Sequence, residues 1–221
     1  MKNKKLVLPL IFTVGIFIIV AAVFIIKKNM PCNDYMNLAE YYGESERHLP
    51  ELILQENINK NKALYEDGHI YLDDEFVSGV LNKRFYWDAN ENLLIYTTAT
   101  SVIKAGLDSK TYDINKSSNT KDYVIAKLRG DKLYIALDFI KEYTALEYKT
   151  YKNPNRVVLT YKFGDKQKWV QADEEAKLRF EPSIKSRILI DVKKKDKLRI
   201  LEENTDKSGF DKVLSESGVI G

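Results

Sequence analysis

The sequence has little of the side chains on which most catalytic and metal sites depend. Cys32 is its one cysteine, so no internal disulfide can form. Its two histidines, His48 and His69, are too few for a three-histidine metal site, while a mixed site of histidine and carboxylates stays open. It contains no glycine-rich phosphate loop, no G-x-S-x-G and no H-E-x-x-H. The sequence therefore predicts no catalytic residue, no metal ligand and no cofactor in this chain.

A basic field on the folded part is also missing. The net charge of +3 comes from the first 30 residues, which carry five lysines and no acid. The remaining residues hold 30 basic and 32 acidic side chains. Because nucleic-acid binding needs a concentrated positive surface, we expect no nucleic-acid partner.

One long apolar run stands near the start, Leu6–Ile26, with 21 residues and no charge. At 1.5 Å per residue it would extend roughly 31 Å, about the thickness of a bilayer core. A cleaved signal peptide is the alternative, but its apolar region is about 7–15 residues long and ends in a small-x-small site. Lipidation of Cys32 is disfavoured because Asn29-Met30-Pro31 precedes it. We expect an uncleaved transmembrane anchor over residues 6–26.

The lysines around this run indicate an orientation. Residues 1–5 contain three lysines and the amino terminus, and Lys27 and Lys28 follow the run. The slight excess on the first side favours a cytoplasmic tail over residues 1–5. The predicted location is the cell membrane, crossed once, with the bulk of the chain extracellular. Residues 27–50 are polar and are interpreted as a tether.

A segment of the chain is repeated at an offset of 63 residues without a gap. Residues 70–98 and 133–161 share Tyr71 with Tyr134 and Phe76 with Phe139, and aliphatic positions coincide between them. Each copy has the pattern of a strand, a helix and a hairpin, so the sequence predicts a doubled β-α-β-β unit. The Ser-, Asn- and Lys-rich stretch 108–121 between the copies is interpreted as an exposed loop.

Three acids follow the first predicted strand of the first copy, Asp73, Asp74 and Glu75. They could form a carboxylate cluster for metal or acid–base chemistry. The second copy has Ala136 and Leu137 at the first two of these positions, so the fold does not require the acids. We favour a role in starting the helix, where acidic side chains complement its dipole.

Aromatic side chains concentrate in the two predicted hairpins. Trp87 lies in the first and Tyr151 in the second. A platform that stacks against sugar rings is one interpretation, and packing across the strands is the other. Trp87 and Tyr151 are the two candidate ligand-binding residues of this part.

The doubled pattern, with HIYLDDEFV in one copy and LYIALDFIKEY in the other, resembles the copper amine oxidase N-terminal-like domain, which we place at residues 51–165. Such domains are common in envelope proteins of Firmicutes. The resemblance implies no copper chemistry, because in the amine oxidases copper ligation and catalysis belong to a different domain.

The Lys-rich short strands of residues 166–221 resemble a bacterial SH3-type domain, with the fold of a small β-barrel. Phe210 stands where that family commonly has a tryptophan, and it is the third candidate ligand-binding residue. The closing signature begins at Ser217 and stops at Gly221, so we expect a truncated domain.

The expected fold class is therefore α+β: an N-terminal transmembrane helix, a duplicated β-α-β-β domain and a small incomplete SH3-like barrel. The expected function is an extracellular module that positions itself or binds at the cell wall, with peptidoglycan or another wall polymer as partner. The order of parts also resembles the non-catalytic front of membrane-anchored glycoside hydrolase family 18 proteins, whose catalytic barrel would lie beyond Gly221. A third possibility is docking of another envelope protein.

Overall fold

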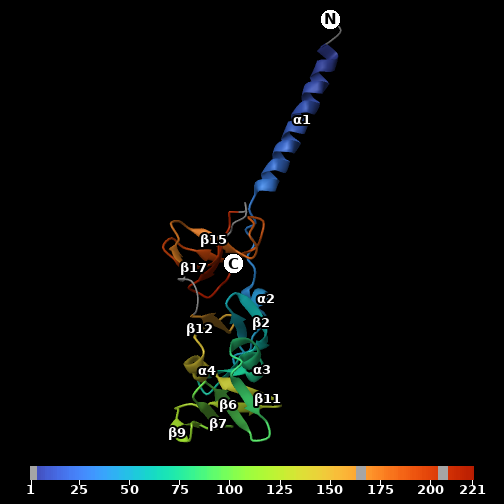
Figure 1. The fold of residues 1–221 in the computed structure, drawn as a ribbon. Helices are drawn as coiled ribbons and strands as arrows, with labels where there is room; N and C mark the ends of the chain where they lie inside the picture. Colours follow the sequence, from blue (N-terminus) through green and yellow to red (C-terminus); the bar gives the residue numbers. More distant parts are fainter. Residues whose placement is uncertain (1–3, 163–167, 204–208) are drawn as a thin grey trace. The chain divides into compact units, whose positions relative to one another are not determined.

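The computed structural model describes residues 4–162, 168–203 and 209–221, with side chains from residue 16 on (Figure 1). Its contacts divide it into two compact units. The first, here called the duplicated unit, comprises residues 37–168 and 216–218. The other, here called the second unit, comprises residues 1–36, 169–215 and 219–221. The predicted boundary between residues 165 and 166 lies outside the described residues, as do the first three residues of the predicted tail.

The duplicated unit is built from short strands and four short helical segments. Its strands are β1 (Glu51–Leu54), β2 (Asn57–Lys62), β3 (Leu64–Glu66), β4 (His69–Asp73), β5 (Phe85–Asp88), β6 (Leu93–Thr97), β7 (Val102–Gly106), β8 (Thr111–Ile114), β9 (Ser117–Thr120), β10 (Ala126–Arg129), β11 (Lys132–Ala136), β12 (Leu146–Tyr151) and β13 (Arg156–Tyr161). Its helical segments are α2 (Leu38–Tyr42), α3 (Asp74–Phe76), the π-helical η1 (Val77–Leu81) and α4 (Leu137–Tyr143).

The repeat of the sequence is visible in the order of these elements. The first copy has the order β4, α3 with η1, β5 and β6, and the second has β11, α4, β12 and β13. β4 begins at His69 and β11 at Lys132, so the two strands coincide at the sequence offset of 63. α3 contacts β11, and α4 contacts both β4 and β11, so the helices of the two copies pack on one shared sheet (Figure 1).

That shared sheet has the order β10-β11-β4-β3 and is antiparallel throughout. In it Leu72 pairs with Ile135, its own counterpart in the other copy. On either side Tyr71 pairs with Ala136 and Asp73 with Tyr134. A register in which equivalent positions pair with each other places a local twofold axis between Leu72 and Ile135. The two copies therefore bury their apolar faces in one common core.

Each hairpin belongs to an outer sheet, and the two outer sheets are completed differently. The β5–β6 hairpin continues through β7, β8 and β9, all antiparallel. The β12–β13 hairpin instead receives β1, which lies parallel to β13, followed by β2. The hairpin of the first copy is thus bordered by strands that follow it in the sequence, and the hairpin of the second copy by strands that precede it. This difference gives the two hairpins different surroundings.

Aromatic rings fill the centre of the common core. Phe85 lies 4.7 Å from Tyr96, Tyr96 lies 4.5 Å from Tyr143, and Phe139 lies 5.2 Å from Tyr143, measured between ring centroids. Phe85 and Phe139 are buried and come from the two different copies. Large rings in tilted and edge-on contact contribute both buried area and geometric specificity, so this cluster joins the copies.

The acids at the start of the first helix cap it, as the sequence favoured. The Asp73 carboxylate accepts hydrogen bonds from the amides of Glu75 and Phe76 at 3.0 and 3.3 Å. Lys132 approaches the same carboxylate at 3.2 Å. Asp73 is therefore occupied with the helix start and with one surface lysine.

The stretch 108–121 differs from the exposed loop predicted for it. It contains β8 and β9, joined by a tight turn in which Asn115 and Lys116 have φ values of 48° and 84°. Asn is among the few non-glycine residues that adopt this left-handed conformation readily. Because β9 is an edge strand with exposed polar side chains, its sequence lacks the apolar alternation of a buried strand.

An ion pair also links equivalent positions of the two copies. The Arg129 guanidinium contacts both carboxylate oxygens of Glu66 at 2.7 Å, and residue 129 is the counterpart of residue 66. The Lys127 ammonium reaches Asp67 at 2.7 Å and Glu66 at 3.2 Å, and its side chain is 3% exposed. These contacts lower the pKa of the Glu66 carboxyl, chiefly through the hydrogen bond from Arg129. Because position 66 is acidic in the first copy and its counterpart 129 is basic in the second, the two copies attract each other at this point.

The second unit contains α1 (Lys4–Asn29) and five strands, β14 (Trp169–Gln171), β15 (Ala176–Arg179), β16 (Ile188–Val192), β17 (Lys197–Glu202) and β18 (Lys212–Ser215). β14, β17 and β18 form one sheet, and β15 and β16 form another. Residues 219–221 hydrogen-bond with β18, where the Val213 amide donates to the Gly221 carbonyl at 2.9 Å. The SH3-type assignment of this part stays a prediction.

The segment after α1 is fixed to this unit by a short parallel bridge between Tyr35 and Ile188. The Tyr35 hydroxyl donates to Asp191 at 2.7 Å, and Lys177 contacts the same carboxylate at 3.0 Å. The beginning of the predicted tether therefore belongs to the second unit. Its later part contains α2, which belongs to the duplicated unit.

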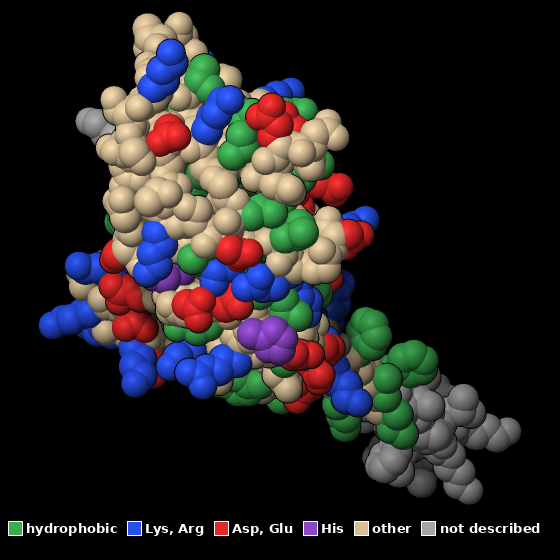
Figure 2. Space-filling view, turned by 90° about the horizontal axis from the view of Figure 1, so that it is seen from below, with side chains coloured by type: hydrophobic (Ala, Val, Ile, Leu, Met, Phe, Trp, Pro, Cys, Tyr) green, Lys and Arg blue, Asp and Glu red, His purple; other side chains and the backbone are tan. Residues whose placement is uncertain are grey.

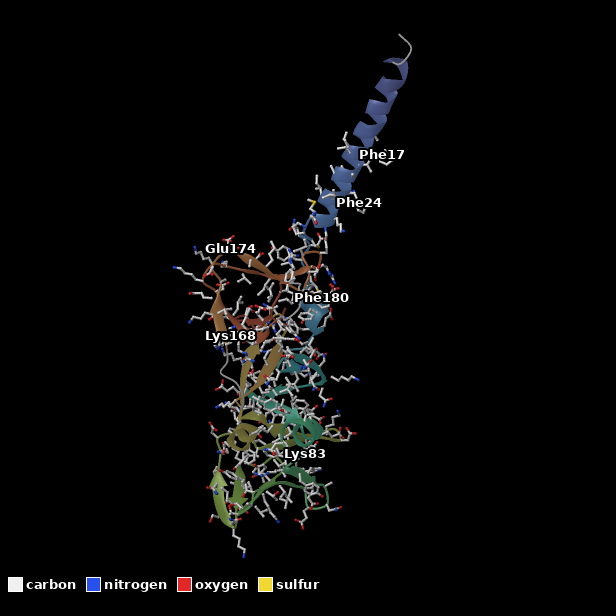
Figure 3. All side chains as sticks on the ribbon, turned by 45° about the horizontal axis from the view of Figure 1, so that its top comes forward. Phe17, Phe24, Lys83, Lys168, Glu174 and Phe180 are labelled. Carbon is white, nitrogen blue, oxygen red and sulfur yellow. The ribbon has the colours of Figure 1, made fainter. Side chains whose placement is uncertain are left out.

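The predicted fold class, α+β with a transmembrane helix, is wrong. The described chain is mostly β, and its helices after α1 are too short to form a layer of their own. None of the helices among the described residues is long and apolar enough to span a bilayer. The side chains described on α1, among them the exposed Phe17 and Phe24 labelled in Figure 3, begin at residue 16.

Candidate functional site

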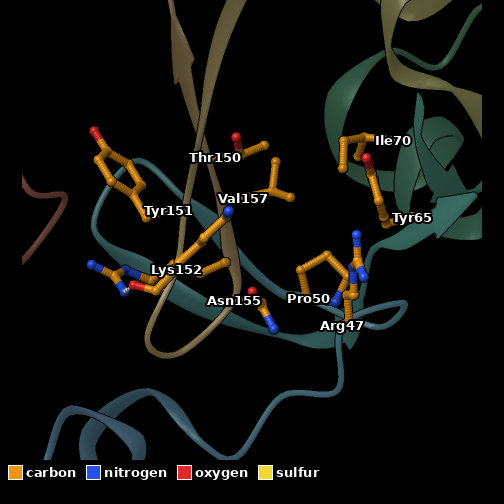
Figure 4. A pocket seen from close by; sticks show the side chains of 10 residues that line it. Arg47, Pro50, Tyr65, Ile70, Thr150, Tyr151, Lys152, Asn155 and Val157 are labelled. Carbon is orange, nitrogen blue, oxygen red and sulfur yellow. Dashed lines mark hydrogen bonds between the residues drawn. The ribbon is translucent and has the colours of Figure 1, made fainter. Parts of the chain in front are cut away.

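The duplicated unit contains a cavity of about 430 Å³ beside the second hairpin (Figure 4). One part of its lining comes from β12, β13 and the turn between them, and the other part from the segment before β1 and from β3 and β4. The lining residues are Arg47, Pro50, Tyr65, Ile70, Thr150, Tyr151, Lys152, Asn155, Arg156 and Val157. We call this cavity the hairpin pocket.

Backbone hydrogen bonds hold the two sides of the hairpin pocket in place. The Tyr65 amide donates to the His48 carbonyl at 2.8 Å, which fixes the turn carrying Arg47 against β3. On the other side, the Glu51 amide donates to the Asn155 carbonyl at 2.9 Å, which joins β1 to the turn of the second hairpin. Strand pairing therefore sets the separation of the pocket walls.

The floor of the hairpin pocket is apolar and its rim is polar. Val157 and Ile70 are 0% and 5% exposed, and Pro50 is also buried. Arg47 and Lys152 are exposed at the rim. Figure 4 shows Arg47 and Tyr65 on one side and Thr150 and Lys152 on the other. A concave site with an apolar base and a few polar groups is the usual form of a small-molecule site.

Several polar groups of the rim have no partner within the part of the chain that the structure describes. The Arg47 guanidinium, the Lys152 ammonium and the Asn155 side-chain amide make no hydrogen bond or ion pair there. The exposed ring of Tyr65 likewise has no aromatic or cationic neighbour among the described residues. These groups are free to contact a ligand.

One difference between the two copies bears directly on the hairpin pocket. Thr150 pairs with Val157 across the second hairpin, and the equivalent pair of the first hairpin is Trp87 with Leu94. The half-buried Trp87 packs against the common core. Thr150 is far smaller than tryptophan, so the volume that an indole covers in the first copy is left open in the second.

Arg156 supports the pocket from inside the turn and is 2% exposed. Its guanidinium donates to the carbonyls of Pro154 at 3.0 Å, Ser217 at 2.8 Å and Gly218 at 3.3 Å. The same group lies between two rings, 4.8 Å from the centroid of Tyr42 and 5.2 Å from that of Tyr151. Burial lowers the pKa of Arg156. Since its donors are engaged by carbonyls, Arg156 shapes the pocket.

The glycine at 218 is required by this packing. Its φ is +74°, and a Cβ added there would lie 2.4 Å from the Tyr151 ring. Only glycine combines this backbone conformation with so close an approach. Tyr151 is thereby held against the guanidinium of Arg156.

The described residues hold no cluster of metal-ligating side chains. No group of three or more His, Cys, Asp or Glu side chains among them is placed to hold a metal ion. His69 Nδ1 lies 3.5 Å from Asp138, and the Tyr148 hydroxyl donates to the same side chain at 3.0 Å. Burial, with this hydrogen bond as the next cause, raises the pKa of Tyr148 to about 12, so its phenol is neutral at physiological pH.

Charges of both signs are interspersed on the face drawn in Figure 2. A concentrated basic surface of the kind that binds nucleic acid is not seen on that face. The lining of the hairpin pocket is nevertheless basic, because three of its ten residues are Arg or Lys and none is Asp or Glu.

The structure separates the three residues predicted to bind ligand. Tyr151 lines the hairpin pocket, but its ring is stacked on Arg156. Trp87 is the counterpart of Thr150 in the other copy and packs against the core. Phe210 belongs to the second unit, where it is half-buried. Sequence reasoning missed Arg47, Tyr65, Thr150 and Lys152. The substitution of Thr150 for Trp87 at the offset of 63 was the available signal.

Comparison with known proteins bears on the same unit. Residues 55–160 match the family model described as copper amine oxidase N-terminal domain. The resemblance inferred from the doubled pattern is confirmed over that range. The matched residues include both copies and most of the lining of the hairpin pocket. No curated protein and no solved structure matches the chain.

Proposed function

We propose that this chain is a non-catalytic binding module of the cell envelope and that it holds wall polymer in the hairpin pocket. The observation that carries the proposal is the difference between the two copies. Where the first copy covers its core with Trp87, the second leaves a cavity of about 430 Å³ under a rim of unpartnered polar groups. The first copy fills the corresponding place with an indole, and the second copy leaves it open. An open concave site of this size is best explained by a ligand.

The chemistry of the lining supports a polymer of sugars. The Tyr65 ring offers a flat apolar surface, and Thr150 and Asn155 offer a hydroxyl and an amide. Sugar rings present apolar C–H faces together with hydroxyl groups, so aromatic and hydrogen-bonding side chains commonly combine to hold them.

A location outside the cell is part of the proposal, and it follows from the resemblance to envelope domains. Protease added to intact source cells should degrade the protein, and it should spare a cytoplasmic marker. Protection equal to that of the marker would remove the envelope part of the proposal. Whether the chain precedes a family 18 glycoside hydrolase barrel stays a prediction, and so does docking of a second envelope protein.

Co-sedimentation of the full chain with purified cell walls tests the binding itself. The informative variant is Thr150→Trp, which places in the second copy the residue that the first copy already accommodates. We expect the variant to fold and to lose most of its wall binding. Thr120→Trp is the matched control, because it makes the same exchange on the exposed edge strand β9, away from the pocket. Wall binding that persists undiminished in Thr150→Trp would exclude the hairpin pocket as the binding site.

A further inference from the structure

We infer that the hairpin pocket recognises a sugar unit that carries a negative charge, and that Arg47 and Lys152 bind the charged group. The inference rests on the proposed function and adds the class of ligand to it. A pocket that bound only neutral sugar would need no cation at its rim.

The two cations are left uncompensated by their surroundings. Neither has an ion-pair partner among the described residues. Two acids that directly follow lining residues in the sequence, at positions 51 and 66, are engaged elsewhere. Glu51 is 5% exposed and pairs with Lys62 at 2.9 Å, while Glu66 pairs with Arg129 at 2.7 Å. Positive charge at the rim is therefore available to a ligand from outside.

The buried cation of the pocket does not serve this purpose. The guanidinium of Arg156 donates to four carbonyls of its own unit at 2.8 to 3.4 Å and lies 4.8 and 5.2 Å from the centroids of two tyrosine rings. Arg47 and Lys152, in contrast, are exposed and end at the mouth (Figure 4). A fork-shaped guanidinium and a mobile ammonium together suit an anionic group whose oxygens face more than one direction.

The remaining lining indicates that the anion is attached to a ring. An isolated inorganic anion would gain nothing from the apolar floor of Ile70 and Val157 or from the open face of Tyr65. A sugar unit bearing a carboxylate or a phosphate uses both parts, with its C–H face on the floor and the anion at the rim. Carboxylate-bearing glycan strands and phosphodiester-linked teichoic acids are the two wall sources of this chemistry.

The experiment measures binding of the full chain by isothermal titration to three probes. They are peptide-free glycan strands of peptidoglycan with free lactyl carboxylates, the same strands with those carboxylates reduced to alcohols, and purified teichoic acid. The variants are Arg47→Gln and Lys152→Gln. Lys149→Gln is the control, because it removes the same charge from an exposed position of the same hairpin that does not line the pocket.

We expect an anionic probe to bind, with each pocket variant weakening its affinity roughly tenfold and the control leaving it unchanged. A loss on carboxylate reduction identifies the glycan strand as the source. Binding to teichoic acid alone identifies the phosphodiester, and both results support the inference. Equal binding of native and reduced strands, unaffected by the two variants, overturns the inference and leaves the proposed function standing. Failure of all three probes removes both.

Discussion

Leu72 of β4 pairs directly with Ile135 of β11, and the two residues are the same position of the two copies. Both are 0% exposed. The contact is the point about which the duplicated unit is organised, because every other pairing in the shared sheet is displaced symmetrically from it. Neither copy can bury this position without the other.

Truncating either side chain of this pair should therefore destabilise the duplicated unit by a similar amount. We expect Leu72→Ala and Ile135→Ala each to lower the free energy of unfolding by roughly 2–5 kcal/mol, the usual cost of deleting a buried aliphatic side chain. The double variant should differ from the sum, because the two side chains share a cavity.

Urea denaturation followed by the fluorescence of Trp87, in a Trp169→Phe background, reports this unit. Leu128→Ala is the control, because Leu128 is 39% exposed. If one of the two core variants behaved like Leu128→Ala, the copies would not share a core.

Exchanging the residues that distinguish the two hairpins should have opposite effects. Trp87→Thr opens a cavity against the core and should destabilise the unit by about 1–3 kcal/mol, less than the usual cost for a fully buried tryptophan because Trp87 is half-buried. Thr150→Trp should leave stability unchanged or raise it. Differential scanning calorimetry of both variants provides the comparison. A large loss for Thr150→Trp would show that the second hairpin cannot accommodate an indole.

Arg156 should matter more for stability than its single charge suggests. Arg156→Met leaves the carbonyls of Pro154 and Ser217 without their donor, and we expect a loss of roughly 2–4 kcal/mol. Arg156→Lys should recover little, since an ammonium cannot reach the same carbonyls in a planar fork. Urea titration of these variants beside Arg84→Met, an exposed control, measures the difference. A free energy of unfolding equal to that of the wild type in Arg156→Lys would contradict the role assigned to the planar guanidinium.

Alkaline pH should weaken the duplicated unit through Tyr148. Burial and the hydrogen bond to Asp138 raise its pKa from 10.0 to about 12. Because the folded state holds the proton more tightly than the unfolded chain, this contribution is complete below pH 10 and is lost as the pH rises to 12. The difference in phenolate absorbance between the wild type and Tyr148→Phe gives the pKa directly. Asp138→Asn should lower it, and an unchanged value would mean that the hydrogen bond is immaterial.

The doubled pattern allowed much of the duplicated unit to be predicted. The offset of 63 located both hairpins and the strands before them, because buried alternation and turn residues recur in the same order. The pairing of Leu72 with Ile135 could not be predicted, since periodicity shows which face of a strand is buried and not which strand covers it. β9 was missed for a related reason: its exposed polar residues carry no apolar alternation.

The candidate site was the least predictable part. Trp87 and Tyr151 were predicted because they are aromatic residues of the hairpins. Only the fold shows that Trp87 fills a space which the second copy leaves open at Thr150. Arg47 enters the pocket from a turn far from the hairpin in the sequence, and it is placed there by the hydrogen bond between Tyr65 and His48. Contacts of this kind depend on the tertiary structure.

Amide chemical shifts of the full chain, titrated with peptide-free wall glycan, test the central claim most directly. The account predicts saturable shifts at Thr150, Lys152 and Asn155 and none at their counterparts Trp87, Ala89 and Asn92. Shifts of equal size in both hairpins, or shifts confined to the second unit, would contradict the claim that the open hairpin of the second copy is the binding site.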